Sequence, residues 1–432
     1  MKTSLKGTPQ KGLIAATWGF FMGFAALAIY SPLAKHMKDV LGLSGFMLGL
    51  LVSIPQLTGS LLRIPFGAYA DSSGSKKPFM ILLSISAMGI GGLVIVYWFF
   101  QPLQDNFFLL PILLFLGILC GFGSASFSVG VAQTSYWFPQ SKQGHALGLY
   151  AGIGNLAPGL FIFIIPVLFD SLGFVGTYLV WLIILIAGII IYALIAHDAY
   201  YFQLIHQGMP KDEAANIARK LGQELIPSSS FVKSLASSAR IRKTWILVFL
   251  YFTSFGGFLA LSSWLPAYWG IYYQQSIVSS GIITAFGFSL LSPIIRAWTG
   301  AYCDRWGENK IAMTGYLIMT IGTFLLAISD FFELSLFGIV ITAIGMGMAN
   351  AAVLKMVPKQ IPHSVGGAAG WIGGIGAFGG LVFPPIFGIF IDLFGNSGFP
   401  YGFYILLLFC VTASIIVFLL SKTSKYTQVS TS

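Results

Sequence analysis

The chain has 432 residues, of which 56% are hydrophobic and 8% charged, with a formal net charge of +10 and a mean hydropathy of +0.85. Soluble domains carry about 25% charged residues, so this composition excludes an ordinary soluble protein and predicts a polytopic α-helical membrane protein. Long apolar runs such as residues 180–194 do not fit the alternating pattern of a membrane β-barrel. The basic residues lie in short segments between apolar runs, which is typical of membrane topology and argues against a nucleic-acid partner.

Twelve membrane-spanning helices are expected, because the apolar runs approach the roughly 20 residues that cross a bilayer. The first run is interpreted as a spanning anchor without a cleavable signal peptide. Polar interruptions separate the others, for example residues 72–78 and 330–333. The predicted spans are 13–35, 44–69, 79–100, 107–137, 146–168, 175–197, 244–268, 278–300, 311–329, 334–355, 368–391 and 398–420.

The distribution of Lys and Arg predicts the orientation. Nineteen of them fall on the side of the N-terminus, and only Lys35 and Lys38 fall on the other side. Cytoplasmic loops carry the excess of positive charge, so we predict a multi-pass protein of the cell (inner or plasma) membrane with both termini cytoplasmic. The polar stretch 198–243 is expected to be a cytoplasmic linker between six-helix halves at 1–197 and 244–432. Within it, residues 211–225 are either an amphipathic helix on the inner membrane surface or a solvated linker.

An internal repeat relates the two halves. Residues 63–74 and 296–307 share Arg, Gly, Asp and Gly at identical spacing, 233 residues apart. Residues 152–155 (Gly-Ile-Gly-Asn) similarly resemble 374–377 (Gly-Ile-Gly-Ala). Repeated halves related by an axis along the membrane normal are typical of transporters, which bind substrate at the interface between the repeats. This pattern disfavours a passive channel.

Arg63 and Arg296 are the two charges expected inside the spans. A central Arg costs about 2.5–3.5 kcal/mol on insertion scales, and no Asp or Glu is expected at comparable depth. Snorkelling or backbone carbonyls would explain one such residue, but two at repeat-equivalent positions favour an anionic substrate as the counter-ion. Guanidinium donors match planar oxyanions, so the candidates are nitrate, nitrite, formate, bicarbonate and small carboxylates.

The repeated motif resembles the hallmark loop of the major facilitator superfamily, G-x-x-x-D-R-x-G-[RK]-[RK]. Residues 300–310 match it well, whereas the copy at 67–77 has Ser72 in place of Arg. The segments around Arg63 and Arg296, with the glycine-rich segments of spans five and eleven, resemble the nitrate/nitrite porter family. The resemblance implies an all-α polytopic fold of twelve transmembrane helices in two pseudo-symmetric six-helix halves, working by alternating access.

The resemblance also implies roles for individual residues. The substrate-binding residues would be Arg63, Arg296, Asn155, Phe127, Tyr251 and Phe255, and the gating residues Asp71, Asp304, Arg305, Gly152, Gly154, Gly374 and Gly376. The glycines either let helices slide or only pack tightly, and the sequence leaves both open. After Asn155 the chain continues with Leu156-Ala157-Pro158 where the family has more glycine. This departure leaves the identity of the anion open, and Pro158 is expected to kink span five.

The predicted function is secondary active transport of nitrate or nitrite by a monomer that needs no cofactor and no metal. The partners are the small inorganic anion and the lipid bilayer. Proton coupling requires a titratable group in the pathway, and no Asp, Glu or His is expected inside a span, so anion exchange is favoured. Proton symport through Tyr251 or water, and transport of another small anion or carboxylate, remain alternatives. An enzyme is not expected, because the spans contain no recognisable nucleophile or metal cluster, and Cys120, Cys303 and Cys410 are isolated.

Overall fold

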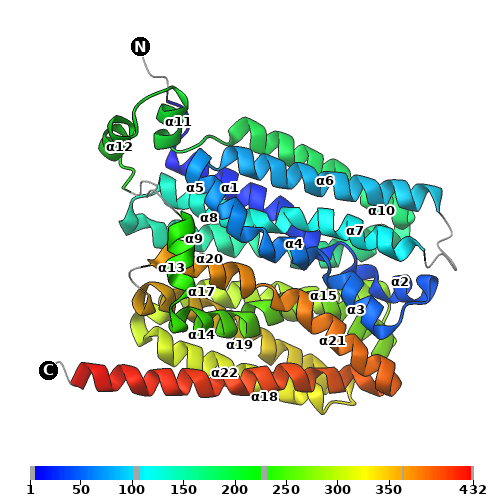
Figure 1. Cartoon of the computed structure of the whole chain (residues 1–432). Helices are drawn as coiled ribbons and strands as arrows, with labels where there is room; N and C mark the ends of the chain where they lie inside the picture. Colours follow the sequence, from blue (N-terminus) through cyan, green and yellow to red (C-terminus); the bar gives the residue numbers. More distant parts are fainter. Residues whose placement is uncertain (1–4, 101–107, 225–230, 362–363, 430–432) are drawn as a thin grey trace.

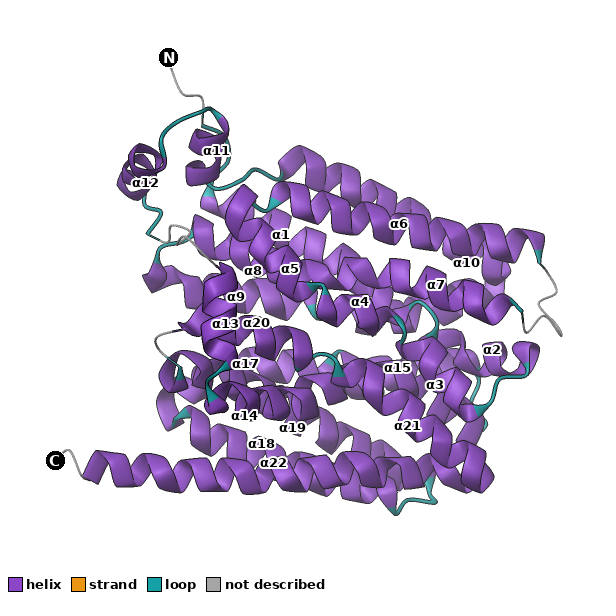
Figure 2. Ribbon diagram, in the orientation of Figure 1, coloured by secondary structure: helices purple, strands orange, loops and turns teal. Residues whose placement is uncertain are grey.

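A computed structural model describes residues 5–100, 108–224, 231–361 and 364–429, and every regular element within them is a helix. Long helices lie side by side in one bundle (Figures 1 and 2). The start of α1 (Pro9–Phe24) and the end of α22 (Gly398–Val429) lie at the same end of the bundle (Figure 1). We call this the terminal end. The opposite end, where α2 (Ala34–Leu41) lies, is the distal end.

The first six crossing segments are built from helices that short turns interrupt. In chain order they are α1, η1 (Ala25–Ala28), η2 (Ser31–Leu33) and α2; α3 (Gly45–Ser53), α4 (Pro55–Leu61) and α5 (Arg63–Ser73); α6 (Lys76–Phe99); α7 (Leu109–Gly121), η3 (Phe122–Ala125) and α8 (Ser126–Trp137); and α9 (Gln140–Gly154) followed by α10 (Ala157–Ile195), which provides the end of the fifth segment and all of the sixth.

The last six segments have a similar construction, with three short π-helical stretches among them. They are α14 (Arg242–Tyr251), the π-helical η4 (Phe252–Gly256), α15 (Gly257–Ala267) and the π-helical η5 (Tyr268–Tyr272); α16 (Ile277–Thr284), the π-helical η6 (Ala285–Ser289) and α17 (Leu291–Trp306); α18 (Glu308–Ala327); α19 (Phe332–Gln360); α20 (Val365–Ile375) and α21 (Gly379–Phe394); and η8 (Gly395–Ser397) with α22.

Among the described residues, nine stretches are long and apolar enough to span a membrane, and one of them, Gln140–Ile195, has 56 residues. A straight helix of that length would be about 84 Å long, against about 30 Å of hydrocarbon. The chain therefore folds back inside this stretch. Gly173 has non-helical angles of φ 63° and ψ −169°, and the rings of Phe161 and Trp181 on either side of it lie 4.8 Å apart.

The stretch Val365–Lys422 also crosses twice, since the rings of Phe387 and Phe403 lie 5.7 Å apart on either side of η8. Residues 45–73, divided among three short helices, form a further crossing. The described chain thus makes twelve crossings, which confirms the predicted number. The predicted start of the fourth span, residue 107, lies outside the described residues, and α7 begins at Leu109.

Helix breaks lie next to the residues that the sequence marks as a site. Leu62 separates α4 from α5, which begins at Arg63. Asn155 and Leu156 separate α9 from α10, and Pro158 stands in the first turn of α10, where its missing N–H costs no hydrogen bond. The helix is therefore interrupted just before the proline, at the place where a kink of span five was predicted.

The two halves touch backbone to backbone at the distal end. A Cβ on Gly45 would lie 2.3 Å from the carbonyl oxygen of Gly388, and a Cβ on Gly49 would lie 2.2 Å from that of Pro384. Asp392 of α21 accepts hydrogen bonds from the backbone N–H of Gly45 at 2.5 Å and of the following residue at 2.9 Å. The second half thus places a carboxylate on the positive N-terminus of α3, where negative charge is stabilising.

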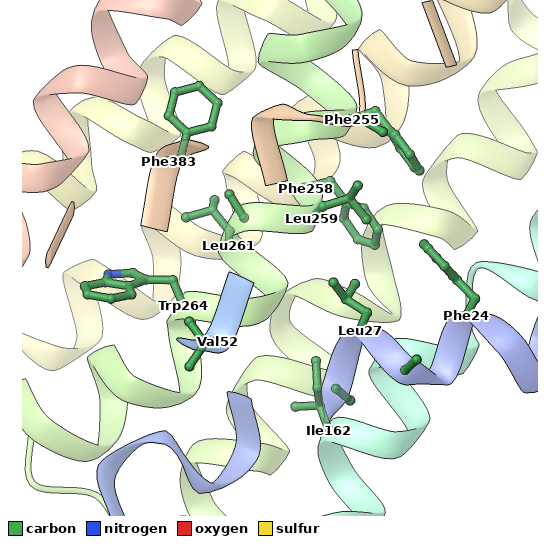
Figure 3. Packing of buried hydrophobic residues seen from close by; sticks show 14 of the residues in the cluster. Phe24, Leu27, Val52, Ile162, Phe255, Phe258, Leu259, Leu261, Trp264 and Phe383 are labelled. Carbon is green, nitrogen blue, oxygen red and sulfur yellow. The ribbon is translucent and has the colours of Figure 1, made fainter. Parts of the chain in front are cut away.

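Apolar side chains close the space between the halves. Leu27, Val52 and Ile162 of the first half share one buried cluster with Phe258 and Trp264 of α15 (Figure 3). All five are at most 1% exposed. Together with the glycine contacts, this cluster closes the distal end of the bundle.

The linker forms three short helices at the terminal end: α11 (Tyr200–His206), α12 (Lys211–Lys220) and α13 (Phe231–Ala239) (Figure 1). The helix α12 is amphipathic, which was one of the two interpretations of residues 211–225. Its apolar side, Ala214, Ala215 and Ala218, is buried in a cluster with Tyr136 and Trp137 of the bundle. The protein itself, and not a membrane surface, covers this face; residue 225 lies outside the described residues.

Candidate functional site

Arg63 begins α5 in the middle of the bundle and is 2% exposed. Its Nε donates to the carbonyl oxygen of Gly59 at 2.9 Å, and its Nη1 donates to that of Gly373, in the second half, at 3.1 Å. Its buried Nη2 has no partner among the described residues. One edge of the guanidinium group therefore remains able to bind an acceptor.

Arg296 lies in α17 and is half-buried. No described residue accepts a hydrogen bond from it, and no described carboxylate forms an ion pair with it or with Arg63. The structure thus brings the two predicted arginines into the same region, with no counter-ion among the described residues.

The ring of Phe255 contacts both arginines. Its ring centroid is 5.4 Å from Cζ of Arg63 and 5.6 Å from Cζ of Arg296, so these carbons are at most 11.0 Å apart. Its ring also stacks on Tyr251 with centroids 4.9 Å apart, as their spacing along the helix predicts. The buried Tyr251 hydroxyl has no partner among the described residues. The aromatic ring therefore stabilises both cations.

Phe127 and Asn155 complete the predicted set. The Phe127 ring centroid lies 4.9 Å from Cζ of Arg63. Asn155 is 1% exposed; its Nδ2 donates to the carbonyl oxygen of Ala151 at 2.6 Å, and its Oδ1 has no partner among the described residues. Asn155, Arg296 and Phe255 line one pocket, and Phe127 and Phe255 both contact Arg63.

The same pocket contains residues that sequence reasoning did not identify. Its lining also includes Phe258, Ser292, Pro293 and Asn350. The side chains approach so closely that the pocket has no room for a water molecule. An anion therefore fits only if these side chains move apart, and a small planar ion requires the least movement.

Two of the predicted gating glycines face the opposite half, and their contacts follow the repeat. A Cβ on Gly374 would lie 2.9 Å from Cγ1 of Ile64, and a Cβ on Gly152 would lie 3.7 Å from Cβ of Ala297. Ile64 and Ala297 each follow a site arginine directly. Each half therefore rests a glycine against the arginine-bearing helix of the other half, and the contact at Gly374 is the tighter one.

The other two glycines pack within their own half. A Cβ on Gly154 would lie 2.0 Å from Cδ1 of Phe20, and a Cβ on Gly376 would lie 2.8 Å from Cδ1 of Tyr251. These positions require glycine because neighbouring rings fill the space. Their contacts fit the static packing alternative.

The first predicted gating carboxylate, Asp71, lies near the end of α5 and accepts a 2.6 Å hydrogen bond from the Tyr136 hydroxyl. Tyr136 therefore partners the carboxylate in a motif where Ser72 replaces the usual arginine. Arg305 is exposed, and Asp304 lies outside the residues whose side chains the structure describes.

The chemistry available at the site is anion recognition. The guanidinium group of Arg296, two amides and the ring of Phe255 line one small pocket, and the guanidinium group of Arg63 contacts the same ring. Among the described residues there is no group of three or more His, Cys, Asp or Glu that would bind a metal. The donors present suit a ligand with several acceptor oxygens.

Comparisons with known proteins place this geometry in context. The family model described as Major Facilitator Superfamily matches residues 16–298 and 278–431. The chain is 28% identical over 426 residues to the probable nitrate transporter NarT of Staphylococcus epidermidis, covering 97% of this chain and 98% of that protein. It is 29% identical to the probable nitrate/nitrite antiporter NarK1 of Thermus thermophilus (86% and 83% covered) and 26% identical to the nitrite extrusion protein of Bacillus subtilis (87% and 85%).

Solved structures share the fold. The xylose transporter XylE from E. coli, in a partially occluded inward-open conformation, matches with a TM-score of 0.73 at 15% identity, covering 95% of this chain and 99% of XylE. A bacterial homolog of the human lysosomal transporter Spinster, inward-facing and unoccupied, matches with a TM-score of 0.67 at 15% identity, covering 97% and 98%. At such identities the likeness concerns the fold alone.

Proposed function

The chain belongs to the Major Facilitator Superfamily, and from this premise we propose that it is a secondary active transporter of nitrate and nitrite. The observation that carries the proposal is the pair Arg63 and Arg296, which share the ring of Phe255 and have no carboxylate partner among the described residues. Relatives that cover most of the chain are named for nitrate or nitrite transport. A small planar oxyanion would neutralise the positive charge of the two arginines and accept hydrogen bonds from their unpaired N–H groups.

The narrow pocket favours nitrate and nitrite over larger carboxylates. Its lining leaves no room for a water molecule, so each added substrate atom requires further separation of close-packed side chains, which costs free energy. Both arginines belong to one chain, and the monomer is therefore sufficient as the transporting unit.

Exchange of one anion for another is the proposed mode of transport. Without an anion, the site holds the positive charges of Arg63 and Arg296, and no described carboxylate neutralises either one. Because the two charges repel each other in a low-dielectric interior, closing the empty site is disfavoured. A bound anion offsets that repulsion, so the loaded carrier changes conformation readily. The halves 1–197 and 244–432 are the proposed moving bodies, joined by the linker 198–243.

The terminal end is the proposed cytoplasmic side of the cell (inner or plasma) membrane. The excess of Lys and Arg in its segments supports this orientation. A fluorescent protein that matures only in the cytoplasm, fused after Ser432, should fluoresce in cells. A dark fusion at normal expression would reverse the orientation.

Uptake of labelled nitrate into proteoliposomes tests the substrate assignment. Vesicles preloaded with nitrate, nitrite, formate, bicarbonate or chloride are compared with protein-free vesicles. We expect internal nitrate and nitrite to accelerate uptake most. Faster nitrate uptake into vesicles that contain formate or bicarbonate than into vesicles that contain nitrite would reject the proposal and indicate another small anion as the substrate.

A further inference from the structure

The second half lacks an amide at the position equivalent to Asn155 of the first half. In the first half, Arg63 is accompanied by Asn155, the last residue of the Gly-Ile-Gly-Asn segment. The equivalent segment of the second half ends in Ala377, whose methyl group is fully buried. Arg296 therefore has no amide companion at the repeat-equivalent position.

Asn350 of α19 occupies the pocket that contains Arg296 and Asn155. Its side chain is 2% exposed, and neither its Oδ1 nor its Nδ2 forms a hydrogen bond with a described residue. Buried amides are normally satisfied, so an unpaired one in a binding pocket requires an explanation. An oxyanion can accept hydrogen bonds only from Nδ2, so the free Nδ2 donors are explained if their acceptor is the transported ligand.

Helix packing holds Asn350 level with Arg296. The helices α17 and α19 meet where a Cβ on Gly347 would lie 2.6 Å from the carbonyl oxygen of Ser292. They meet again where Lys355 Nζ donates to the carbonyl oxygen of Gly300 at 2.6 Å.

Both contacts join residues 55 positions apart, so the two helices run parallel in a fixed register. From the first contact, Arg296 lies about 6 Å further along one helix and Asn350 about 4.5 Å further along the other. The two side chains therefore reach the pocket at nearly the same depth.

We infer that Asn350 is a specificity-determining anion ligand, the amide with which the second half replaces the one missing from its repeat. This inference rests on the proposed function. Each half then supplies one arginine and one amide, Arg63 with Asn155 and Arg296 with Asn350. Nitrate has three acceptor oxygens and nitrite has two, so the additional Nδ2 donor stabilises bound nitrate more than bound nitrite. Because the amide is neutral, it adds donors without neutralising Arg296.

The test is the affinity of purified protein for nitrate and for nitrite in three variants. Asn350→Leu removes the donors at similar volume, and Asn350→Asp keeps the shape but adds a carboxylate beside Arg296. Thr342→Val is the matched control, since Thr342 is a buried residue of α19 whose hydroxyl bonds within its own helix, to the carbonyl oxygen of Gly338 at 2.8 Å. Melting temperatures without anion show whether each variant is folded.

We expect Asn350→Leu to weaken nitrate binding by about tenfold, the value of one hydrogen bond to a charged group, and to weaken nitrite binding less. Asn350→Asp should weaken both by more than tenfold, and the control should match the wild type. If the wild type binds both anions and Asn350→Leu leaves the ratio of their affinities unchanged, the inference is wrong and the proposed function stands. If Asn350→Leu does not fold, wild-type affinities in Asn350→Asp overturn the inference equally. A wild type that binds neither anion would overturn the proposed function together with this inference.

Discussion

Substitution of Arg296 by lysine isolates the contribution of a guanidinium group to anion binding. Lysine keeps the positive charge but lacks the planar fork of donors that meets an oxyanion in two parallel hydrogen bonds. Arg296 donates no hydrogen bond to any described residue. Its Cζ lies 5.6 Å from the ring centroid of Phe255. A lysine ammonium can also lie over that ring. The folded protein therefore loses little when Arg296 is replaced.

The expected loss of affinity follows from the hydrogen bonds. The substitution removes one of two bonds between charged groups, each about 1.5–3 kcal/mol. At about 1.4 kcal/mol for each factor of ten, the dissociation constant for nitrate should rise roughly 10- to 100-fold, with an unchanged melting temperature for the anion-free protein.

Arg63→Lys provides the informative comparison. Arg63 donates to the carbonyl oxygens of Gly59 and Gly373, and the second bond joins the two halves. Lysine cannot keep both bonds and also contact the anion. We therefore expect a similar loss of nitrate affinity together with a lower melting temperature, which Arg296→Lys should not show.

Thermal stabilisation by nitrate measures both effects in one titration. Nitrate at 100 times the dissociation constant stabilises the wild type by about 2.7 kcal/mol, whereas a variant that binds 100-fold more weakly gains only about 0.4 kcal/mol at the same concentration. Equal stabilisation of the wild type and of Arg296→Lys would refute the reasoning that the fork of Arg296 binds the anion.

Three further substitutions test other parts of the account. Gly374→Ala should slow exchange more than the matched Gly152→Ala, because only the first places a methyl group 2.9 Å from a side chain of the other half; equal rates at equal expression would show that this contact is not limiting. Phe255→Leu should raise the half-saturating nitrate concentration severalfold, because the ring contacts both arginines. A wild-type value would show that Phe255 only packs in the core and does not contribute to anion binding. Asp392→Asn should weaken the cap on α3 by about 1 kcal/mol or more and so open the distal end more often. A membrane-impermeant thiol reagent should then label Leu48→Cys, a position buried in α3, faster from the distal side, and unchanged labelling would argue against the cap.

The sequence predicted the twelve crossings, the repeat and the arginine pair, because hydropathy and spacing are local properties. The resemblance to the nitrate/nitrite porter family singled out Tyr251 and Phe255, and their spacing of four residues predicted that both lie on one helix face. The absence of an Asp or Glu at the depth of the two arginines was an expectation that the sequence alone allowed.

Contacts between distant segments could not be read from the sequence. Asp392 caps a helix that begins 347 residues earlier, and no local pattern marks this pairing. Tyr136 donates to Asp71 across 65 residues, and no local pattern predicted this partner. Asn350 belongs to no recognised motif, and its place in the pocket depends on the register between α17 and α19. These features depend on tertiary packing between long helices.

Anion exchange is the central claim, and counterflow tests it most directly. Proteoliposomes that contain nitrite and proteoliposomes without a permeant anion are given the same labelled nitrate outside, with and without an imposed pH gradient. Because the empty site holds two uncompensated arginines, we predict that nitrite-loaded vesicles take up nitrate many times faster and that the pH gradient changes little. Equal uptake by the empty vesicles, or accumulation driven by an inward proton gradient, would contradict exchange and favour proton symport.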